Sequence, residues 1–395
     1  MLGINIFCNL HMEQPIYLDN AATTALDPEV LNAMLPYMQE HFGNPSSAYS
    51  LGRNSKSAIE EARKCIGGIL GVKPSTLIFT SGGTEGNNTA IASSVNELGC
   101  THIITSPIEH HAVLHTVEHY THSKNITFSY VKLTANGEVD YEDLKAQLVT
   151  QAKQGKKCLV SLMHANNEIG SLLDISLVGK ICRENDALFH SDCVQTIGHY
   201  PINLKACGVH FASASGHKFH GPKGTGILYV SDEIKAYPLI FGGSQERKLR
   251  AGTENVYGII GFAKALELAT AGFERDSKYI TALNHFMRKQ LSQAVPGVSF
   301  NNPENSLYTV LSVCFPLDGQ SEYLVTLFDM KGVCVSGGSA CSSGDGGSHV
   351  IRAIGKTDLC ATLRFSFSKH TTEAEITRTV EIAASIFQKK EVSTL

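Results

Sequence analysis

Lys218 is the residue whose type and position most directly suggest covalent chemistry. It lies in Ala214–Gly224, ASGHKFHGPKG, among two histidines and three glycines. A lysine sheltered where a strand ends can lose its charge and become a nucleophilic amine. For any single lysine a solvated loop position is the ordinary alternative, so Lys218 needs support from other motifs.

Two further motifs offer a carboxylate and an anion site. Asp192 follows the apolar run Ala187–His190, and residues at such strand ends line the crevice of open α/β sheets. In Leu77–Asn88, LIFTSGGTEGNN, a strand-like run meets a glycine turn, and a helix beginning near Gly83 and Thr84 suits a phosphate. A helix-capping aspartate and a tight turn are the plain alternatives, because neither a Walker A lysine nor a complete G-x-G-x-x-G is present.

A thiol and an arginine also differ from their surroundings. Cys341 lies in Gly337–Ser343, GGSACSS, whereas the other ten cysteines have more apolar contexts. Exposure in a loop of small residues favours thiol reactivity, with an inert loop thiol as the alternative. Arg364 lies within the apolar run LRFSF and needs a partner, for which a carboxylate is the natural choice.

Together these motifs match the requirements of one cofactor. Pyridoxal phosphate needs a lysine for a Schiff base, an acid against the pyridinium nitrogen and a phosphate site. Lys218, Asp192 and the glycine turn supply these three groups. An amino-acid substrate would then explain Arg364.

The elements that must position these residues alternate between strands and helices. The predicted strands are Leu77–Thr80, His102–Thr105, Thr127–Val131, Cys158–Met163, Ala187–His190, His210–Ala214 and Thr225–Val230. Amphipathic helices such as Ser55–Leu70 and Ile175–Glu184 lie between several of them, which predicts a mostly parallel sheet covered on both faces. The link before Thr225–Val230 is too short for a helical crossover, so this strand is predicted to be antiparallel.

The pattern changes after about Tyr257. Two long helices and two strands are predicted there: Gly258–Leu268, Ser277–Ala294, Thr309–Phe315 and Leu363–Phe367. We expect a large domain of residues 21–257 and a smaller α+β domain formed by residues 1–20 and 258–395.

Composition limits the function classes that are open to the chain. Its 33 basic and 37 acidic residues leave a net charge of −4, which gives no general attraction to nucleic acid or an anionic membrane. No stretch reaches the about 18 apolar residues of a spanning helix, and residues 1–12 lack the basic residues of a signal peptide. Met1 and Met12 are both candidate starts. Eleven scattered cysteines without a C-x-x-C predict reduced thiols, no metal site and a cytoplasmic location.

Ordered motifs along nearly the whole chain resemble the pyridoxal-phosphate cysteine desulfurases of the NifS/IscS type, within the class V aminotransferases. They run from YLDNAAT (Tyr17–Thr23) to LRFSFSKHTTEAEI (Leu363–Ile376). Between these stand FGNPSS, FTSGGTE, EHHAV, HANNEIG, HSDCVQ, SGHKFHGPKG, RAGTEN and SGGSACSS. The resemblance implies an α/β fold of the fold type I class of pyridoxal-phosphate enzymes. Its large domain would hold a seven-stranded, mostly parallel sheet beside a smaller α+β domain.

The resemblance also implies how motif residues hold the cofactor. Lys218 should form the Schiff base and shuttle protons, Asp192 should pair with the pyridinium nitrogen, and His110 should stack on the ring and assist acid–base steps. Gln195 should hydrogen-bond the phenolic oxygen, with Asn167 beside it near the substrate carboxylate. The phosphate should be held by Gly83, Thr84, Ser215 and His217.

The implied reaction converts L-cysteine to L-alanine. Arg364 should bind the substrate carboxylate, and Cys341 should attack the substrate sulfur and become a persulfide. Thr253, in RAGTEN, should reach the phosphate of the other subunit, which implies a homodimer. The implied partner is a sulfur-acceptor protein, either an iron–sulfur scaffold or a sulfur carrier, with no direct role for nucleic acid or a membrane.

Other functions are compatible with parts of this pattern. A selenocysteine lyase, which releases selenium from L-selenocysteine, shares the fold, the cofactor and a comparable cysteine loop, although GSACSS favours the desulfurase. A class V enzyme that moves an amino group would leave Cys341 idle. A non-catalytic carrier of sulfur or metal would have no use for a complete cofactor site.

Three features depart from the family pattern. Cys193 replaces a small residue beside Asp192 and is expected to serve packing. Gly86 stands where a polar residue is common and is expected to loosen the helix start. The short tail after Ile376 weakens the expectation that the enzyme docks an iron–sulfur scaffold.

Overall fold

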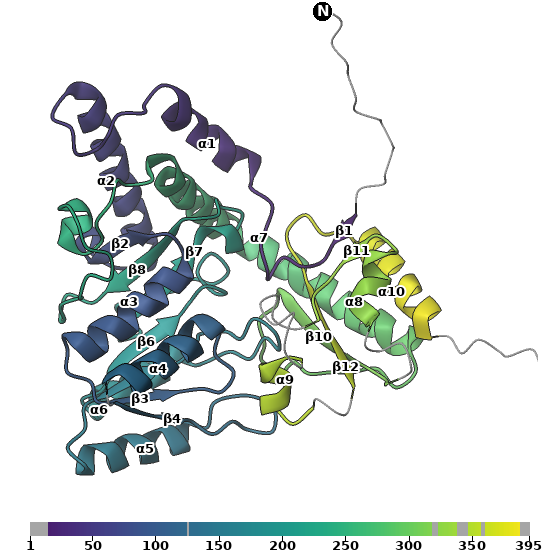
Figure 1. Ribbon diagram of the computed structural model, residues 1–395. Helices are drawn as coiled ribbons and strands as arrows, with labels where there is room; N and C mark the ends of the chain where they lie inside the picture. The colour runs from purple at the N-terminus through teal and green to yellow at the C-terminus, as the bar shows by residue number, and fades with distance from the viewer. Residues whose placement is uncertain (1–14, 125, 318–322, 338–346, 357–359, 388–395) are drawn as a thin grey trace, which may run out of the picture.

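The described chain forms two main sheets that lie side by side, a large one from the N-terminal two thirds and a small one mainly from the C-terminal third (Figure 1). The computed structural model describes residues 15–124, 126–317, 323–337, 347–356 and 360–387. The predicted catalytic residue Cys341 therefore lies outside the described residues.

The large sheet has seven strands in the order β2-β8-β7-β6-β5-β3-β4. Their bounds are β2 (Leu77–Thr80), β3 (His102–Thr105), β4 (Thr127–Tyr130), β5 (Cys158–Ser161), β6 (Leu188–Asp192), β7 (Phe211–Ser215) and β8 (Gly226–Val230). β8 runs antiparallel to both β2 and β7, and the other pairs are parallel. The mostly parallel seven-stranded sheet and its antiparallel strand are thus confirmed.

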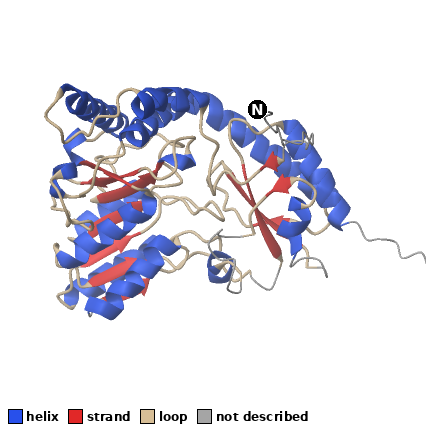
Figure 2. Cartoon of the chain, turned by 45° about the horizontal axis from the view of Figure 1, so that its top comes forward, coloured by secondary structure: helices blue, strands red, loops and turns tan. Residues whose placement is uncertain are grey.

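Helices cover both faces of this sheet (Figure 2), because most of its strands are apolar on both sides. The helices of this part are α1 (Pro28–Gln39), α2 (Ser50–Leu70), α3 (Gly83–Asn96), α4 (His111–Lys124), α5 (Tyr141–Lys153) and α6 (Ile175–Glu184). On one face Ile66 and Val178 pack with Phe189 of β6. On the other face Ile91 and Val113 pack with β3 and β5.

One helix, α7 (Val256–Ala294), replaces the two helices predicted for this region, so that prediction is wrong. The predicted gap, residues 269–276, contains Gly272, which lowers helix propensity. However, α7 packs against α1, α2 and α10 (Glu373–Phe387), and such tertiary packing outweighs propensity. Among the described helices, α7 is long and apolar enough to cross a membrane by length and composition alone. Its packing against three helices is that of a core helix.

The small sheet has the antiparallel order β12-β10-β9. The elements of this part are β1 (Ile16–Tyr17), β9 (Ser299–Phe300), β10 (Val310–Phe315), α8 (Leu324–Asp329), β11 (Val333–Cys334), α9 (His349–Ala353) and β12 (Ala361–Ser366). β1 pairs with β11, and Leu18 joins Phe328 and Phe365 in one apolar cluster. Residues 16–18 therefore pack against the C-terminal part of the chain, and the grouping of residues 1–20 with residues 258–395 stays a prediction.

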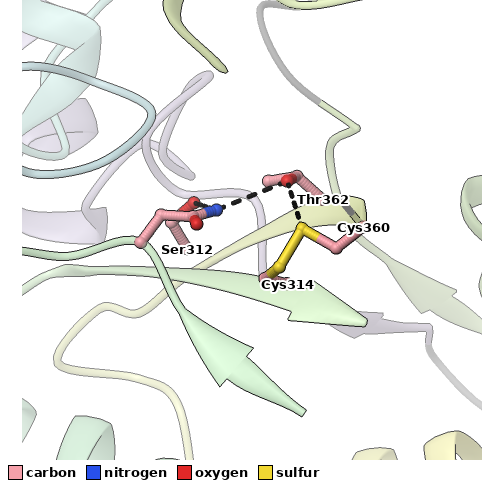
Figure 3. The surroundings of a disulfide bond; sticks show 5 residues. Ser312, Cys314, Cys360 and Thr362 are labelled. Atoms are coloured by element: carbon pink, nitrogen blue, oxygen red, sulfur yellow. Dashed lines mark hydrogen bonds between the residues drawn. A yellow bond between two sulfur atoms is a disulfide. The ribbon is translucent and has the colours of Figure 1, made fainter. Parts of the chain in front are cut away.

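A disulfide joins Cys314 of β10 to Cys360, just before β12 (Figure 3). It contradicts the prediction that all cysteines are reduced thiols. Because Cys314 lies opposite Thr362 in the antiparallel register, Cys360 lies close by, with a Cα–Cα distance of 5.4 Å. The 46-residue separation in sequence carries no hint of this proximity.

Candidate active site

An open cleft of about 530 Å³ lies at the carboxyl ends of β6 and β7, beside the first turn of α3. Ten of the predicted site residues line it: Gly83, Thr84, His110, Asn167, Asp192, Gln195, Ser215, His217, Lys218 and Arg364. They come from segments far apart in the sequence. The parallel sheet brings them together, because its strand ends meet at one edge.

Lys218 ends the single 3₁₀ turn η2 (Gly216–Lys218), which directly follows β7. Its Nζ donates hydrogen bonds to the carbonyl oxygens of Ala21, at 2.7 Å, and Ala22, at 2.9 Å. The segment after β1 therefore holds the amine in the cleft. Sequence reasoning assigned no role to this segment, although YLDNAAT was one of the motifs that carried the resemblance.

Asp192 is the last residue of β6 and is 6% exposed. Its Oδ2 accepts a hydrogen bond from Nδ2 of Asn87 at 2.6 Å, and its Oδ1 accepts one from the Val194 N–H at 3.0 Å. Both carboxylate oxygens are thus held in place. Sequence reasoning missed Asn87. The available signal was the pair of asparagines that ends LIFTSGGTEGNN.

The first turn of α3 forms an anion site. The N-cap residue Gly82 has φ +155°, and no side chain caps the helix, so the first-turn N–H groups of Gly83 and Thr84 have no intrahelical acceptor. A Cβ on Gly83 would lie 2.4 Å from a Val194 methyl group, so the close approach of the turn to β6 requires glycine there. Ser215 and Lys223 line the same cleft.

Glu85 lies beside this anion site but is paired. Arg250 contacts its carboxylate at 3.1 Å, and the Ser81 N–H donates to it at 2.8 Å. Burial pushes the pKa of Glu85 upward, but the hydrogen bonds from Arg250 and Ser81 outweigh burial and leave the pKa below its usual value. Arg250 therefore balances the charge nearest the anion site.

The histidines of the cleft are neutral at physiological pH. Burial, opposed by the Asp192 charge, lowers the pKa of His110, and burial with the charges of Lys218 and Lys223 lowers that of His217 to about 4. His110 Nδ1 accepts the Ala112 N–H at 3.1 Å, which leaves the ring proton on Nε2. His110 can therefore donate a hydrogen bond within the cleft.

Arg364 of β12 is 2% exposed, and part of it is already engaged. Its Nη2 contacts the Asp19 carboxylate at 2.7 Å, and its Nη1 donates to the carbonyl oxygen of Asn167 at 3.0 Å. Its Nε is buried and has no hydrogen-bond partner among the described residues. The carboxylate expected beside Arg364 is thus supplied by the chain itself, through a residue that sequence analysis did not single out.

Gln195 and Thr253 complete the set of predicted site residues that the structure describes. The Gln195 amide donates to the Ala21 carbonyl at 3.1 Å, next to the Lys218 contact. Thr253 is exposed and lines a separate hollow with Arg250. Within one chain the structure does not bring Thr253 into the cleft.

Two of the three departures from the family pattern are packing features. Cys193 is fully buried, and burial above all raises the pKa of its thiol to about 12, so it is not a reactive thiol. Gly86 is also buried, and a Cβ there would lie 2.7 Å from the Ser213 hydroxyl. Gly86 therefore allows α3 to pack closely on β7, and the expected loosening of the helix start stays a prediction.

Comparisons with known proteins agree over nearly the whole chain. The family model described as Aminotransferase class-V matches residues 16–379. The cysteine desulfurase IscS of Dictyoglomus turgidum is 42% identical over 385 residues, covering 96% of each chain. A solved structure titled NifS-like protein has a TM-score of 0.85 at 36% identity, covering 94% of this chain and 99% of its own. Another, titled SspA in complex with cysteine, has a TM-score of 0.78 at 32% identity, covering 90% of this chain and 100% of its own.

Proposed function

The chain belongs to the aminotransferase class-V family and is a cysteine desulfurase, and we propose that it uses pyridoxal phosphate to convert L-cysteine to L-alanine. The observation that carries this proposal is the convergence of three groups in one cleft. These are the Lys218 amine, the Asp192 carboxylate and the uncapped first turn of α3.

The residues of the cleft fit this cofactor. Lys218 would hold it covalently, Asp192 would face its ring nitrogen, and the N–H groups of Gly83 and Thr84, with Ser215 and His217, would hold its phosphate. When bound, the cofactor serves as an electron sink that makes the carbon–sulfur bond of the substrate labile. The glycine turn and the absence of a capping side chain leave the α3 N–H groups available for an anion.

The chain's own residues orient the substrate and move its protons. Arg364 would bind the substrate carboxylate beside the carbonyl of Asn167. The Lys218 amine would carry protons between substrate atoms, and His110 would donate its Nε2 proton within the cleft. Burial of Arg364 excludes water from this interaction and strengthens it.

Sulfur transfer would use Cys341. A thiolate attacks the substrate sulfur, the carbon–sulfur bond breaks, and the bonding electrons remain with the carbon that becomes the methyl group of alanine after protonation. The persulfide on Cys341 would then pass to an acceptor protein. None of the described free cysteines lines the cleft. The proposal of Cys341 rests on its place in the SGGSACSS motif.

We also propose that the enzyme is a cytoplasmic homodimer. Thr253 is exposed, as expected for a residue that reaches the phosphate of a partner subunit. Sedimentation of the pure enzyme tests this point, and a fully active monomer would refute it.

The direct test is incubation of pure protein with L-cysteine and, separately, L-selenocysteine, with measurement of alanine, sulfide and selenide. We expect alanine and sulfur transfer from L-cysteine, whereas activity with L-selenocysteine alone would indicate a selenocysteine lyase. Borohydride reduction followed by peptide mapping should place the cofactor on Lys218. A label on Lys223, which lines the same cleft, would contradict the assignment.

A further inference from the structure

We propose that Asn87, His190 and Ser161 form a buried relay that fixes the orientation of the Asp192 carboxylate. The relay runs from α3 through β6 to β5, and all three of its residues are buried. None of these three residues has a role in the reaction described above. The geometry of the relay stands by itself, and its effect on cofactor binding rests on the proposed function.

The relay is continuous. Asn87 Nδ2 lies 2.6 Å from Asp192 Oδ2, and Asn87 Oδ1 lies 3.1 Å from His190 Nε2. His190 Nδ1 in turn lies 2.9 Å from the Ser161 hydroxyl. Asn87 is 1% exposed and the other two residues are 0% exposed, so no solvent competes for these bonds.

Chemistry sets the direction of every bond in the relay. An ionised carboxylate accepts hydrogen bonds and does not donate, so the Asn87 amide must present its NH₂ group to Asp192 and its oxygen to His190. His190 must then donate from Nε2 to Asn87, and its unprotonated Nδ1 must accept a hydrogen bond from the Ser161 hydroxyl. The relay therefore requires a neutral His190 with its proton on Nε2. Burial independently favours the neutral ring, since it lowers the pKa of His190 to about 4.

A second buried carboxyl group clarifies why this relay matters. Glu109 is 1% exposed, and burial, with a smaller contribution from the Asp192 charge, raises its pKa well above the usual value. Burial thus disfavours the charged form of Glu109, while Asp192 receives hydrogen bonds from Asn87 and from the Val194 N–H. Two nearby carboxyl groups with opposite environments serve different roles. Asn87 is the side chain through which the relay holds the Asp192 carboxylate, which lines the cleft.

The geometry is tested first on the protein without cofactor, by NMR of the histidine ring nitrogens near neutral pH. His190→Gln assigns the His190 signals by their loss. We expect a proton on Nε2 and none on Nδ1. A proton on Nδ1, or on both nitrogens, would overturn the relay, and this outcome does not depend on any enzymatic activity.

The positioning role is tested by equilibrium binding of pyridoxal phosphate to the same protein. Asn87→Ala should weaken binding by about tenfold, as expected for the loss of one hydrogen bond to a charged group. His190→Met, which has no donor, should also weaken binding, and His190→Gln should restore it because its amide can donate to Asn87. Asn88→Ala is the matched control, since Asn88 donates to the carbonyl oxygens of Thr84 and Ala112 rather than to Asp192.

Each outcome separates the relay from a purely structural role. Equal binding by the His190→Met and His190→Gln proteins would overturn the positioning role, whatever their thermal stability. If a variant does not fold, the ring-proton measurement on the unmodified protein decides the proposal. If the unmodified protein fails to bind pyridoxal phosphate, the proposed function fails, and the NMR result still stands.

Discussion

Arg364→Lys should lower kcat/KM for L-cysteine sharply, because one guanidinium group serves several acceptors at once. Its Nη2 contacts Asp19 at 2.7 Å and its Nη1 contacts the Asn167 carbonyl at 3.0 Å. The single ammonium nitrogen of lysine cannot span both groups and a substrate carboxylate. The side chain is 3% exposed, so water cannot replace the lost donor.

The expected magnitude follows from the number of bonds lost. One hydrogen bond to a charged group contributes about 1.5–3 kcal/mol, which corresponds to a loss of about tenfold to a hundredfold in kcat/KM. The loss should appear mainly in KM, because Arg364 would bind the substrate carboxylate equally strongly in the ground state and in the transition state. Initial rates of alanine and sulfide formation over a range of L-cysteine concentrations measure both constants.

Arg378→Lys is the control for this experiment. Arg378 is 65% exposed and pairs with Glu381 at 3.2 Å on α10, where a surface ion pair contributes little. Its kcat/KM should match that of the unmodified enzyme. The reasoning fails if Arg364→Lys also matches the unmodified enzyme, or if kcat falls while KM stays the same.

Three other predictions concern the thiol, a buried ion pair and a buried histidine. Cys341→Ala should lower sulfide release by orders of magnitude without loss of cofactor absorbance, while Cys193→Ala should leave the rate unchanged; near-normal release from the former would show that the thiol is idle. Arg63→Met should destabilise the fold by about 3–5 kcal/mol in urea unfolding, because Glu246, bound at 2.7 Å and equally buried, would lose its partner; an unchanged midpoint would refute this. Burial lowers the pKa of His102 to about 4, so the unfolded chain binds its proton first, and stability should be lost as pH falls from about 6.5 toward 4. His102→Gln should make that part of a pH series of urea unfolding curves less steep, because other buried histidines such as His190 and His217 still contribute to it. An unchanged slope would contradict the assignment.

Local patterns allowed much of the fold to be predicted. Apolar runs bounded by turn residues predicted the strands of the large sheet to within a few residues, because such strands are buried on both faces and read as continuous apolar segments. The short link between β7 and β8 predicted that β8 is antiparallel, because a parallel connection needs a crossover helix that cannot fit within this link. The continuity of α7 was not predictable in this way, because its polar middle is held helical by packing against helices from both ends of the chain.

The sequence by itself determined which residue types the chemistry uses: the lysine after a strand, the aspartate at a strand end, and the glycine turn before a helix. Each is a local signal, because strand ends and helix starts are set by neighbouring residues. Only the tertiary structure decided their partners. Asp19 lies 345 residues from Arg364, Asn87 lies 105 residues from Asp192, and the Cys314–Cys360 disulfide depends on strand register. A buried polar group must find a partner wherever the fold brings one within hydrogen-bond distance, and sequence spacing carries no information about that distance.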